Sequence, residues 1–202
     1  MGAGGGLRRA DFRAFCREQR RWLGDFALFS ALKGVHRGAA WTEWAPPLRS
    51  RQPRELSRAR RTLAGEIAYH QFVQYQFHRR WSALRRCCRR HGISLFGDLP
   101  IFVSHDSADV WAHPEAFRLA PNGRPSVVAG IPPDYFSRTG QLWGNPLYRW
   151  DVLHRSGYDW WIGRLRASFA RFDAVRIDHF VGFHRFWKVP GAAKTAARST
   201  GT

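Results

Sequence analysis

The chain is organised around one stretch, Phe172-Asp173-Ala174-Val175-Arg176-Ile177-Asp178-His179-Phe180. Its alternation of side chains predicts a β-strand, in which successive residues point to opposite faces of a sheet. Val175 and Ile177 then share an apolar face that we expect helices to cover. Arg176 and Asp178 share the other face with Ala174, and the carboxylate comes last along the strand. Catalytic residues of a (β/α) barrel lie at the C-terminal ends of its strands, so this stretch predicts a barrel strand that carries a functional carboxylate.

A structural explanation of the same stretch stays open. An Arg and an Asp on one strand face can simply form an ion pair at the end of the strand. A fully buried Arg–Asp pair, however, adds little to stability and often lowers it. The stretch by itself therefore leaves two interpretations, a structural ion pair and a functional site.

Length and composition predict a folded chain with one main domain. The 202 residues fall short of the roughly 250 residues of a complete eight-stranded barrel. A hydrophobic content of 44%, an aromatic content of 15% and ten Trp argue against disorder. No apolar run approaches the ~18 residues of a transmembrane helix, and Met1 to Gly6 lack the apolar segment of a signal peptide.

The formal charge of +18 does not by itself indicate a nucleic-acid-binding protein. The basic residues are 30 Arg and three Lys, spread along the chain and densest between Arg49 and Arg90, and no nucleic-acid-binding motif accompanies them. We therefore expect neither a nucleic-acid nor a membrane partner. Cys16, Cys87 and Cys88 have no metal-ligand spacing, which favours free thiols in a reducing compartment such as the cytoplasm.

Periodicity and turn residues predict the remaining elements. The first part of the chain should contain a disordered N-terminus over 1–9, a helix from N-cap Asp11 to Lys33 with a possible break at Gly24, a loop over 34–54 that Trp41 and Trp44 pin to the protein surface, and a helix over 54–90 with His70 on its apolar face. A strand over 93–99 that ends near Asp98, a helix start at 106–111 and an ordered aromatic loop over 121–150 should follow. The last part should contain a helix over 151–172, a short strand or lid at 184–189 and an irregular tail over 191–202. Strands alternating with helices indicate an α/β fold, and residues 10–190 contain too few strands to close a barrel.

Four segments of the chain resemble one known family. They are FGDLPIFV at 96–103, DSADVW at 106–111, VAGIPPDYFSRTGQLWGNPLYRW at 128–150 and VRIDHF at 175–180. These segments are similar to those of the amylomaltases, which are 4-α-glucanotransferases, or disproportionating enzymes, of the α-amylase superfamily. The long central segment is specific to that family, whereas the Arg-x-Asp strand indicates only the superfamily. The resemblance covers roughly residues 10–197 and only the middle of a family enzyme.

The resemblance implies a fold, a reaction and a set of site residues. It implies a partial (β/α)8 TIM-type barrel with a long inserted loop and helical segments, and no cofactor or metal. The reaction would transfer a 4-α-glucan segment between maltodextrin donor and acceptor with retention, through a covalent glycosyl intermediate. By resemblance, Asp178 is the nucleophile, which Arg176 would keep ionised. The resemblance also implies substrate contacts by Asp98, Tyr135, Trp143, Asn145 and His179, and loop anchoring is the alternative role for Tyr135 and Trp143.

The sequence departs from the family pattern in its carboxylates. Retaining glycoside chemistry needs a second carboxyl group, about 5 Å from the nucleophile, as general acid/base. In the family this is a Glu on the next strand, but no Asp or Glu follows Asp178 here, and the family's first barrel strand is also absent. We therefore expect a fragment truncated at both ends. The alternatives to an enzyme are an inactive truncated remnant with at most weak glucan binding, and a basic nucleic-acid binder.

Overall fold

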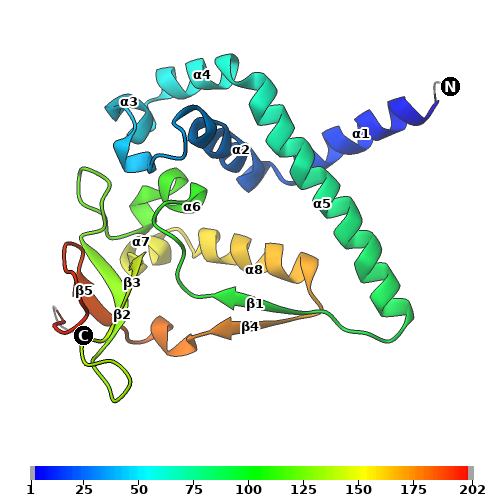
Figure 1. Ribbon diagram of the computed structural model, residues 1–202. Coiled ribbons are helices and arrows are strands. Elements are labelled where there is room, and N and C mark those ends of the chain that lie inside the picture. Colours follow the sequence, from blue (N-terminus) through cyan, green and yellow to red (C-terminus); the bar gives the residue numbers. More distant parts are fainter. Residues whose placement is uncertain (1–2, 200–202) are drawn as a thin grey trace. The chain divides into compact units, whose positions relative to one another are not determined.

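The computed structural model describes residues 3–199 and divides into two compact units, Met1–Cys87 and Cys88–Thr202 (Figure 1). Within the described residues, the first unit contains helices and the second contains every strand. The chain passes from one unit to the other near the end of its longest helix.

From residue 3 onward, the first unit is built from six helical segments. They are α1 (Ala3–Glu18), α2 (Arg20–Val35), the 3-10 turn η1 (Trp41–Glu43), α3 (Pro46–Arg49), α4 (Pro53–Thr62) and α5 (Ala64–Arg90), whose last turn belongs to the second unit. The prolines lie at the first or second position of α3 and α4, where a missing N–H costs no intrahelical hydrogen bond.

The helix boundaries differ from the sequence prediction in three places. Helix α1 already begins at Ala3, where disorder over residues 1–9 was expected, and Asp11 lies inside this helix rather than at its N-cap. The chain breaks at Gln19 and not at Gly24, which lies inside α2. Glycine lowers helix stability by only about 1 kcal/mol, so packing of the helix can offset it. The predicted helix over 54–90 is divided by Leu63 into α4 and α5.

The two tryptophans expected to pin the loop over 34–54 onto the protein lie in the core of the first unit. Trp41 and Trp44 are each 2% exposed. The Trp44 ring stacks on His36 at 5.3 Å between ring centroids, and its indole N–H donates to the Ala39 carbonyl at 3.3 Å. The loop over 34–54 is therefore fastened by buried aromatic side chains.

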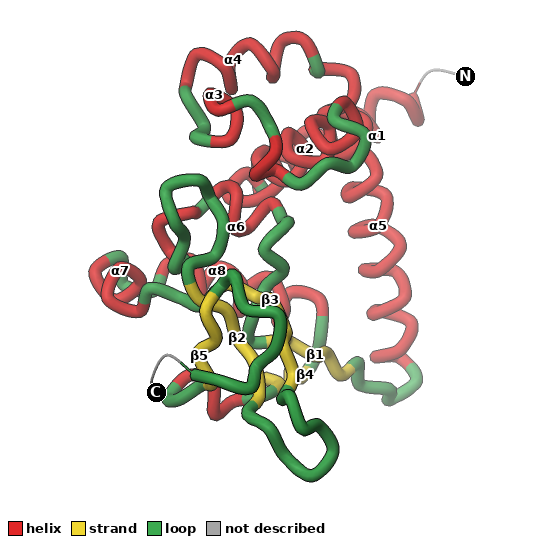
Figure 2. The backbone as a smooth tube through the Cα atoms, turned by 60° about the vertical axis from the view of Figure 1, so that its left-hand side comes forward, coloured by secondary structure: helices red, strands yellow, loops and turns green. Residues whose placement is uncertain are grey.

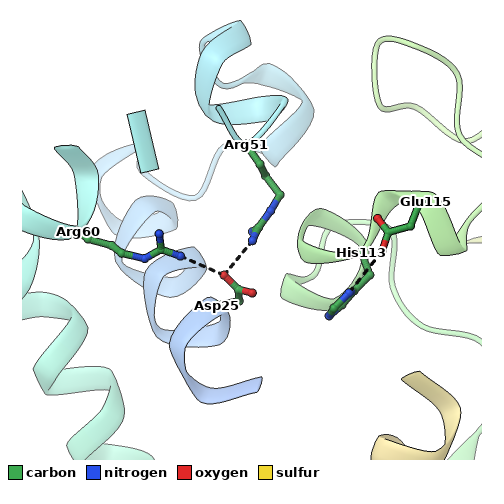
Figure 3. Close-up of polar contacts among 5 residues, drawn as sticks. All are labelled: Asp25, Arg51, Arg60, His113 and Glu115. Atoms are coloured by element: carbon green, nitrogen blue, oxygen red, sulfur yellow. Dashed lines mark hydrogen bonds and ion pairs between the residues drawn. The ribbon is translucent and has the colours of Figure 1, made fainter. Parts of the chain in front are cut away.

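A carboxylate on α2 joins three segments of the first unit (Figure 3). Asp25 accepts from the Nη2 groups of Arg51, after α3, at 2.9 Å and of Arg60, on α4, at 3.5 Å. This polar contact holds the α3–α4 region on α2.

The apolar face predicted for residues 54–90 does not form a continuous core. In α5, Tyr75 is buried and packs against the rings of Phe12 and Phe15 from α1. Phe77 and Leu84 are 48% and 47% exposed, and His70 is half-buried rather than a core residue. Helical periodicity predicted the helix correctly, but it could not say how much of the face a neighbour covers.

Up to residue 199, the second unit contains two small sheets and the helices that accompany them (Figure 2). Its elements are β1 (Phe96–Pro100), α6 (Ala108–Ala112), η2 (Pro114–Ala116), β2 (Val127–Ile131), β3 (Gln141–Pro146), α7 (Trp150–Arg155), α8 (Asp159–Arg171), β4 (Ala174–Asp178), η3 (Phe180–Phe183) and β5 (Trp187–Pro190). Strands β1 and β4 pair in parallel, and β3-β2-β5 form an antiparallel sheet.

Asp173 and Gly97 set the close pairing of β1 with β4. The Asp173 carboxylate accepts from the Leu95 backbone N–H at 3.0 Å and from Arg89 Nη2 at 2.6 Å. A Cβ atom at Gly97 would overlap the ring of Phe172, so only glycine lets this ring lie against β1. Helix α8 contacts both strands and covers one face of the pair.

The segment predicted as an aromatic loop over 121–150 contains strands β2 and β3. A register shift between Val128 and Gly130 interrupts their ladder, and such a bulge blurs the alternation that marks a strand in sequence. The predicted short strand near 184–189 is confirmed as β5, which pairs with β2. The tail is irregular up to residue 199, although Ala196 is fully buried beside Val128 and Val189.

The fold class is confirmed at the level of a mixed α/β fold. The β1–β4 pair and the α7–α8 connection between β2–β3 and β4 follow the predicted order of strand and helix. Over residues 3–199 the strands form a parallel pair and a separate antiparallel sheet, so a closed barrel is not seen.

Candidate active site

Three of the predicted site residues come together at the C-terminal ends of β1 and β4. In the parallel register Asp98 lies opposite Arg176, and Pro100 lies opposite Asp178. Arg176 donates two hydrogen bonds to Asp98 in a bidentate arrangement, from Nε to Oδ1 at 3.1 Å and from Nη2 to Oδ2 at 2.5 Å. Its Nη2 lies 4.0 Å from Asp178 Oδ1. The arginine therefore lies between two carboxylates, and its main partner is Asp98.

This geometry modifies the predicted role of Arg176. The sequence suggested that Arg176 acts on Asp178, but the short hydrogen bonds go to Asp98. These bonds lower the pKa of the Asp98 carboxyl group and raise the pKa of Arg176. The side chains are also 53% to 65% exposed, so the cluster is not the buried pair first considered. An exposed ion pair contributes little to stability, and its clearest effect is to orient Asp98.

The backbone that follows β1 is held by side chains that the sequence did not single out. Arg164 of α8 donates to the Pro100 carbonyl at 2.6 Å and to the Ile101 carbonyl at 3.2 Å. The hydroxyl of Tyr148, which is 1% exposed, donates to the same Ile101 carbonyl at 2.6 Å. No local pattern could reveal these bonds, because they join residues 47 to 64 positions apart.

Phe102, which the sequence analysis also missed, is surrounded by aromatic rings. Its ring centroid lies 6.3 Å from Trp143 and 6.5 Å from His179. Trp143 and His179 meet edge to face at 5.1 Å, so these two predicted substrate-binding residues are brought together. His179 has a φ of 53°, in the left-handed region, which turns the chain immediately after Asp178.

Asn145 and Tyr135 are placed differently from the other predicted residues. The Asn145 side-chain amide donates to the Val103 carbonyl at 2.9 Å and so holds the loop after β1. Tyr135 is 96% exposed in the loop between β2 and β3, which extends below the sheet in Figure 1. Its ring meets that of Phe136. That exposure argues against Tyr135 as a loop anchor, and Asp134 performs this role by accepting from the Phe136 N–H at 2.9 Å.

Neither a metal-ligand cluster nor a helix that could span a membrane is found in the described part of the chain. No group of three or more His, Cys, Asp or Glu side chains in it is arranged to hold a metal ion. None of its helices is both long and apolar enough to span a membrane.

Comparison with known proteins gives the family. A family model described as 4-alpha-glucanotransferase matches residues 5–200. The chain belongs to this family. It is 54% identical over 188 residues to the 4-alpha-glucanotransferase of Thermus thermophilus, and 49% identical over 187 residues to that of Synechocystis. These matches cover 93% and 92% of the chain.

Solved structures agree with this assignment. The amylomaltase from Streptococcus agalactiae in complex with acarbose matches with a TM-score of 0.90 and 39% identity, over 94% of the chain. The amylomaltase from Corynebacterium glutamicum, at 20% identity and a TM-score of 0.74, shares the fold. The chain spans only 38% of the Thermus relative and 38% of the Streptococcus structure.

Proposed function

We propose that this chain provides the nucleophile strand of an enzyme that transfers 4-α-glucan segments between maltodextrins. The observation that carries the proposal is the position of Asp178, at the C-terminal end of a parallel strand and 4.0 Å from an arginine already bound to Asp98. In a retaining double displacement, Asp178 attacks the anomeric carbon and forms a covalent glycosyl intermediate, and the 4-hydroxyl of an acceptor glucan then displaces it.

The neighbouring side chains have separate roles in this proposal. Asp98, ionised and oriented by Arg176, accepts hydrogen bonds from hydroxyl groups of the glucose that is cleaved. Trp143 and His179 line the same end of β4 and contact the sugar. Tyr135, fully presented to solvent on its loop, covers the donor glucan. The likeness to an amylomaltase whose structure contains acarbose supports a maltooligosaccharide ligand. The cytoplasmic compartment expected from the sequence is part of the same proposal.

The general acid/base is the group that this chain does not provide. Asp98 cannot serve, because its bonds to Arg176 lower its pKa and keep it ionised at neutral pH, whereas the acid must hold a proton. The sequence contains no Asp or Glu after Asp178. We therefore propose that the 202-residue chain alone binds glucan weakly and does not turn it over.

A chimera tests the transfer reaction. Residues 10–190 replace the matching segment of the Thermus thermophilus enzyme, and maltotriose is the substrate. We expect glucose together with maltodextrins longer than maltotriose, and loss of both products in the Asp178→Asn chimera. Production of glucose and maltose without longer chains would reject transfer. Mass spectrometry after trapping with a fluorinated glucosyl fluoride should find the covalent adduct on Asp178, and an adduct elsewhere would reject its role.

The 202-residue chain is assayed alongside the chimera. We expect no product from maltotriose. Disproportionation by the purified chain that disappears in Asp178→Asn would overturn the proposal that a further carboxylate is required.

A further inference from the structure

Helix α8 packs on the β1–β4 pair, and its Arg164 side chain contacts the C-terminal end of β1. Arg164 donates to two successive carbonyls, Pro100 at 2.6 Å and Ile101 at 3.2 Å. Its guanidinium carbon lies 5.5 Å and 5.0 Å from the ring centroids of Trp160 and Trp161. The two rings and the two carbonyls together fix the position of the Arg164 guanidinium group. Lysine cannot make the same set of contacts, because its ammonium group is not planar.

The same carbonyl has a second donor. Tyr148 contributes a buried hydroxyl to Ile101, 2.6 Å from its oxygen. Burial raises the pKa of Tyr148 and lowers that of Arg164, and Asp109 is the nearby carboxylate that acts on both. Two donors on one backbone oxygen give the Ile101 peptide a defined orientation, because each bond restricts a different direction.

From Ile101 the contact continues to the residue beside Asp178. A Cβ atom at Gly182 would lie 3.0 Å from Ile101 Cδ1 and 3.0 Å from His179 Cδ2. Ile101 and the His179 ring thus lie so close to Gly182 that a methyl group there would be crowded by both. Phe102, the next residue after Ile101, contacts the His179 ring as well. Ile101 and Phe102 thus connect the backbone after β1 to the surroundings of the His179 ring.

We propose that Arg164 is a positioning residue of the glucan site: it fixes the backbone after β1 and, through Ile101 and Phe102, the orientation of His179 beside Asp178. It touches no substrate in this proposal. The proposal rests on the proposed function for its effect on glucan binding, but the effect on His179 is independent of any ligand. Positional errors of about 1 Å at a site are enough to reduce its efficiency by orders of magnitude.

Nuclear magnetic resonance of the histidine rings in the 202-residue chain tests this proposal. The His179 ring lies against the edge or face of Trp143, whose ring current makes the His179 shift sensitive to orientation. Loss of a signal in His179→Gln assigns the resonance. We expect displaced His179 signals in Arg164→Met, a smaller displacement in Arg164→Lys, and none in Arg166→Met or Arg166→Lys, which alter an exposed arginine of the same helix.

Tyr148→Phe gives a second test of the same connection. It removes one of the two donors to Ile101 and retains the ring, so we expect a displacement of the His179 signals in a folded protein. If Arg164→Met does not fold, Arg164→Lys and Tyr148→Phe decide the result. Coincident His179 signals in folded wild type, Arg164→Lys and Tyr148→Phe would overturn the proposal.

Acarbose titration of the same samples separates this proposal from the proposed function. We expect the Arg164 variants to bind acarbose about tenfold more weakly than wild type, and the Arg166 variants to bind as wild type does. Displaced His179 signals with no acarbose binding by wild type would support the positioning role and count against glucan recognition by this chain. Unchanged His179 signals with normal acarbose binding would reject the positioning role alone.

Discussion

Replacement of Tyr148 by Phe should give a protein whose stability relative to wild type reverses at alkaline pH. At pH 8 the change removes one buried hydrogen bond, worth about 1 kcal/mol. The cost is not larger, because Arg164 still donates to the Ile101 carbonyl at 3.2 Å and no buried acceptor is left unpaired. The ring itself stays, so its packing on Phe102 and Phe117 is retained.

The alkaline effect follows from the pKa of the phenol. Burial is the main cause that raises the pKa of Tyr148 well above its ordinary value of about 10. Above about pH 10 the unfolded chain loses this proton while the folded chain keeps it, so stability falls with pH by about 1.4 kcal/mol per unit. The stabilisation is complete below the unfolded pKa and is lost as pH rises toward the folded pKa. Tyr148→Phe lacks this loss, and the two stability curves should cross at about pH 10.7, where the loss in wild type equals the hydrogen-bond contribution.

Urea unfolding at several pH values between 8 and 11 measures this crossing. Circular dichroism gives the free energy of unfolding for wild type and Tyr148→Phe at each pH. Tyr135→Phe is the matched control, because that tyrosine is 96% exposed, and its curve should follow that of wild type. Parallel curves for wild type and Tyr148→Phe throughout this range would refute the raised pKa of Tyr148 and the reasoning built on it.

Three further outcomes can be measured on the same chain. Gly97→Ala should lower the free energy of unfolding by about 1–3 kcal/mol, because the added Cβ overlaps the Phe172 ring. Gly163→Ala should raise it by about 1 kcal/mol, because no atom lies within 4 Å of the added Cβ in helix α8. Equal effects of the two substitutions would contradict this reasoning. Gly182→Ala should lower the free energy of unfolding by about 1–3 kcal/mol, because the added Cβ would be crowded by Ile101 and His179. An unchanged urea midpoint would show that these two side chains can move to make room for it. In a carbon-detected titration, the Asp98 carboxyl group should have a pKa below the ordinary ~3.9, and the Arg176→Met substitution should raise that pKa again. The Asp98–Arg176 pair stabilises the fold above the unfolded pKa of Asp98, and this stabilisation is lost as pH falls through the lower folded pKa.

The sequence predicted the two strands of the candidate site better than it predicted the surrounding helices. The alternation in residues 174–178 and the short apolar run before Asp98 both became strands, and the parallel pairing brought Asp98 opposite Arg176. Residue type and strand period were sufficient here, because a parallel register places the ends of neighbouring strands together. Which carboxylate the arginine would prefer was not predictable, because it depends on the register between two segments 78 residues apart.

The errors in the helices and the long loop have a common origin. Helical periodicity in α5 showed an apolar face, but Phe77 and Leu84 remain about half exposed, since burial depends on what packs against the helix. The glycine and proline residues over 121–150 marked turns correctly, but they concealed β2 and β3, whose ladder contains a bulge. Local signals report where the chain turns, whereas pairing and burial are decided by distant segments.

The two carboxylates of the site differ in a way that bears on their chemistry. Asp98 has both oxygens occupied by Arg176, so its charge is fixed and its orientation is set. Asp178 lies 4.0 Å from the same Nη2 nitrogen, beyond hydrogen-bond distance, and is 65% exposed. A nucleophile must keep an oxygen lone pair available for attack. A carboxylate that accepts two short hydrogen bonds from an arginine is a weaker nucleophile, because those bonds draw on its lone pairs and its negative charge. The division suits Asp98 to binding a sugar and Asp178 to attacking one. It also means that Arg176→Met should disturb the orientation of Asp98 first, so that in the chimera weaker glucan binding should accompany any loss of the chemical step.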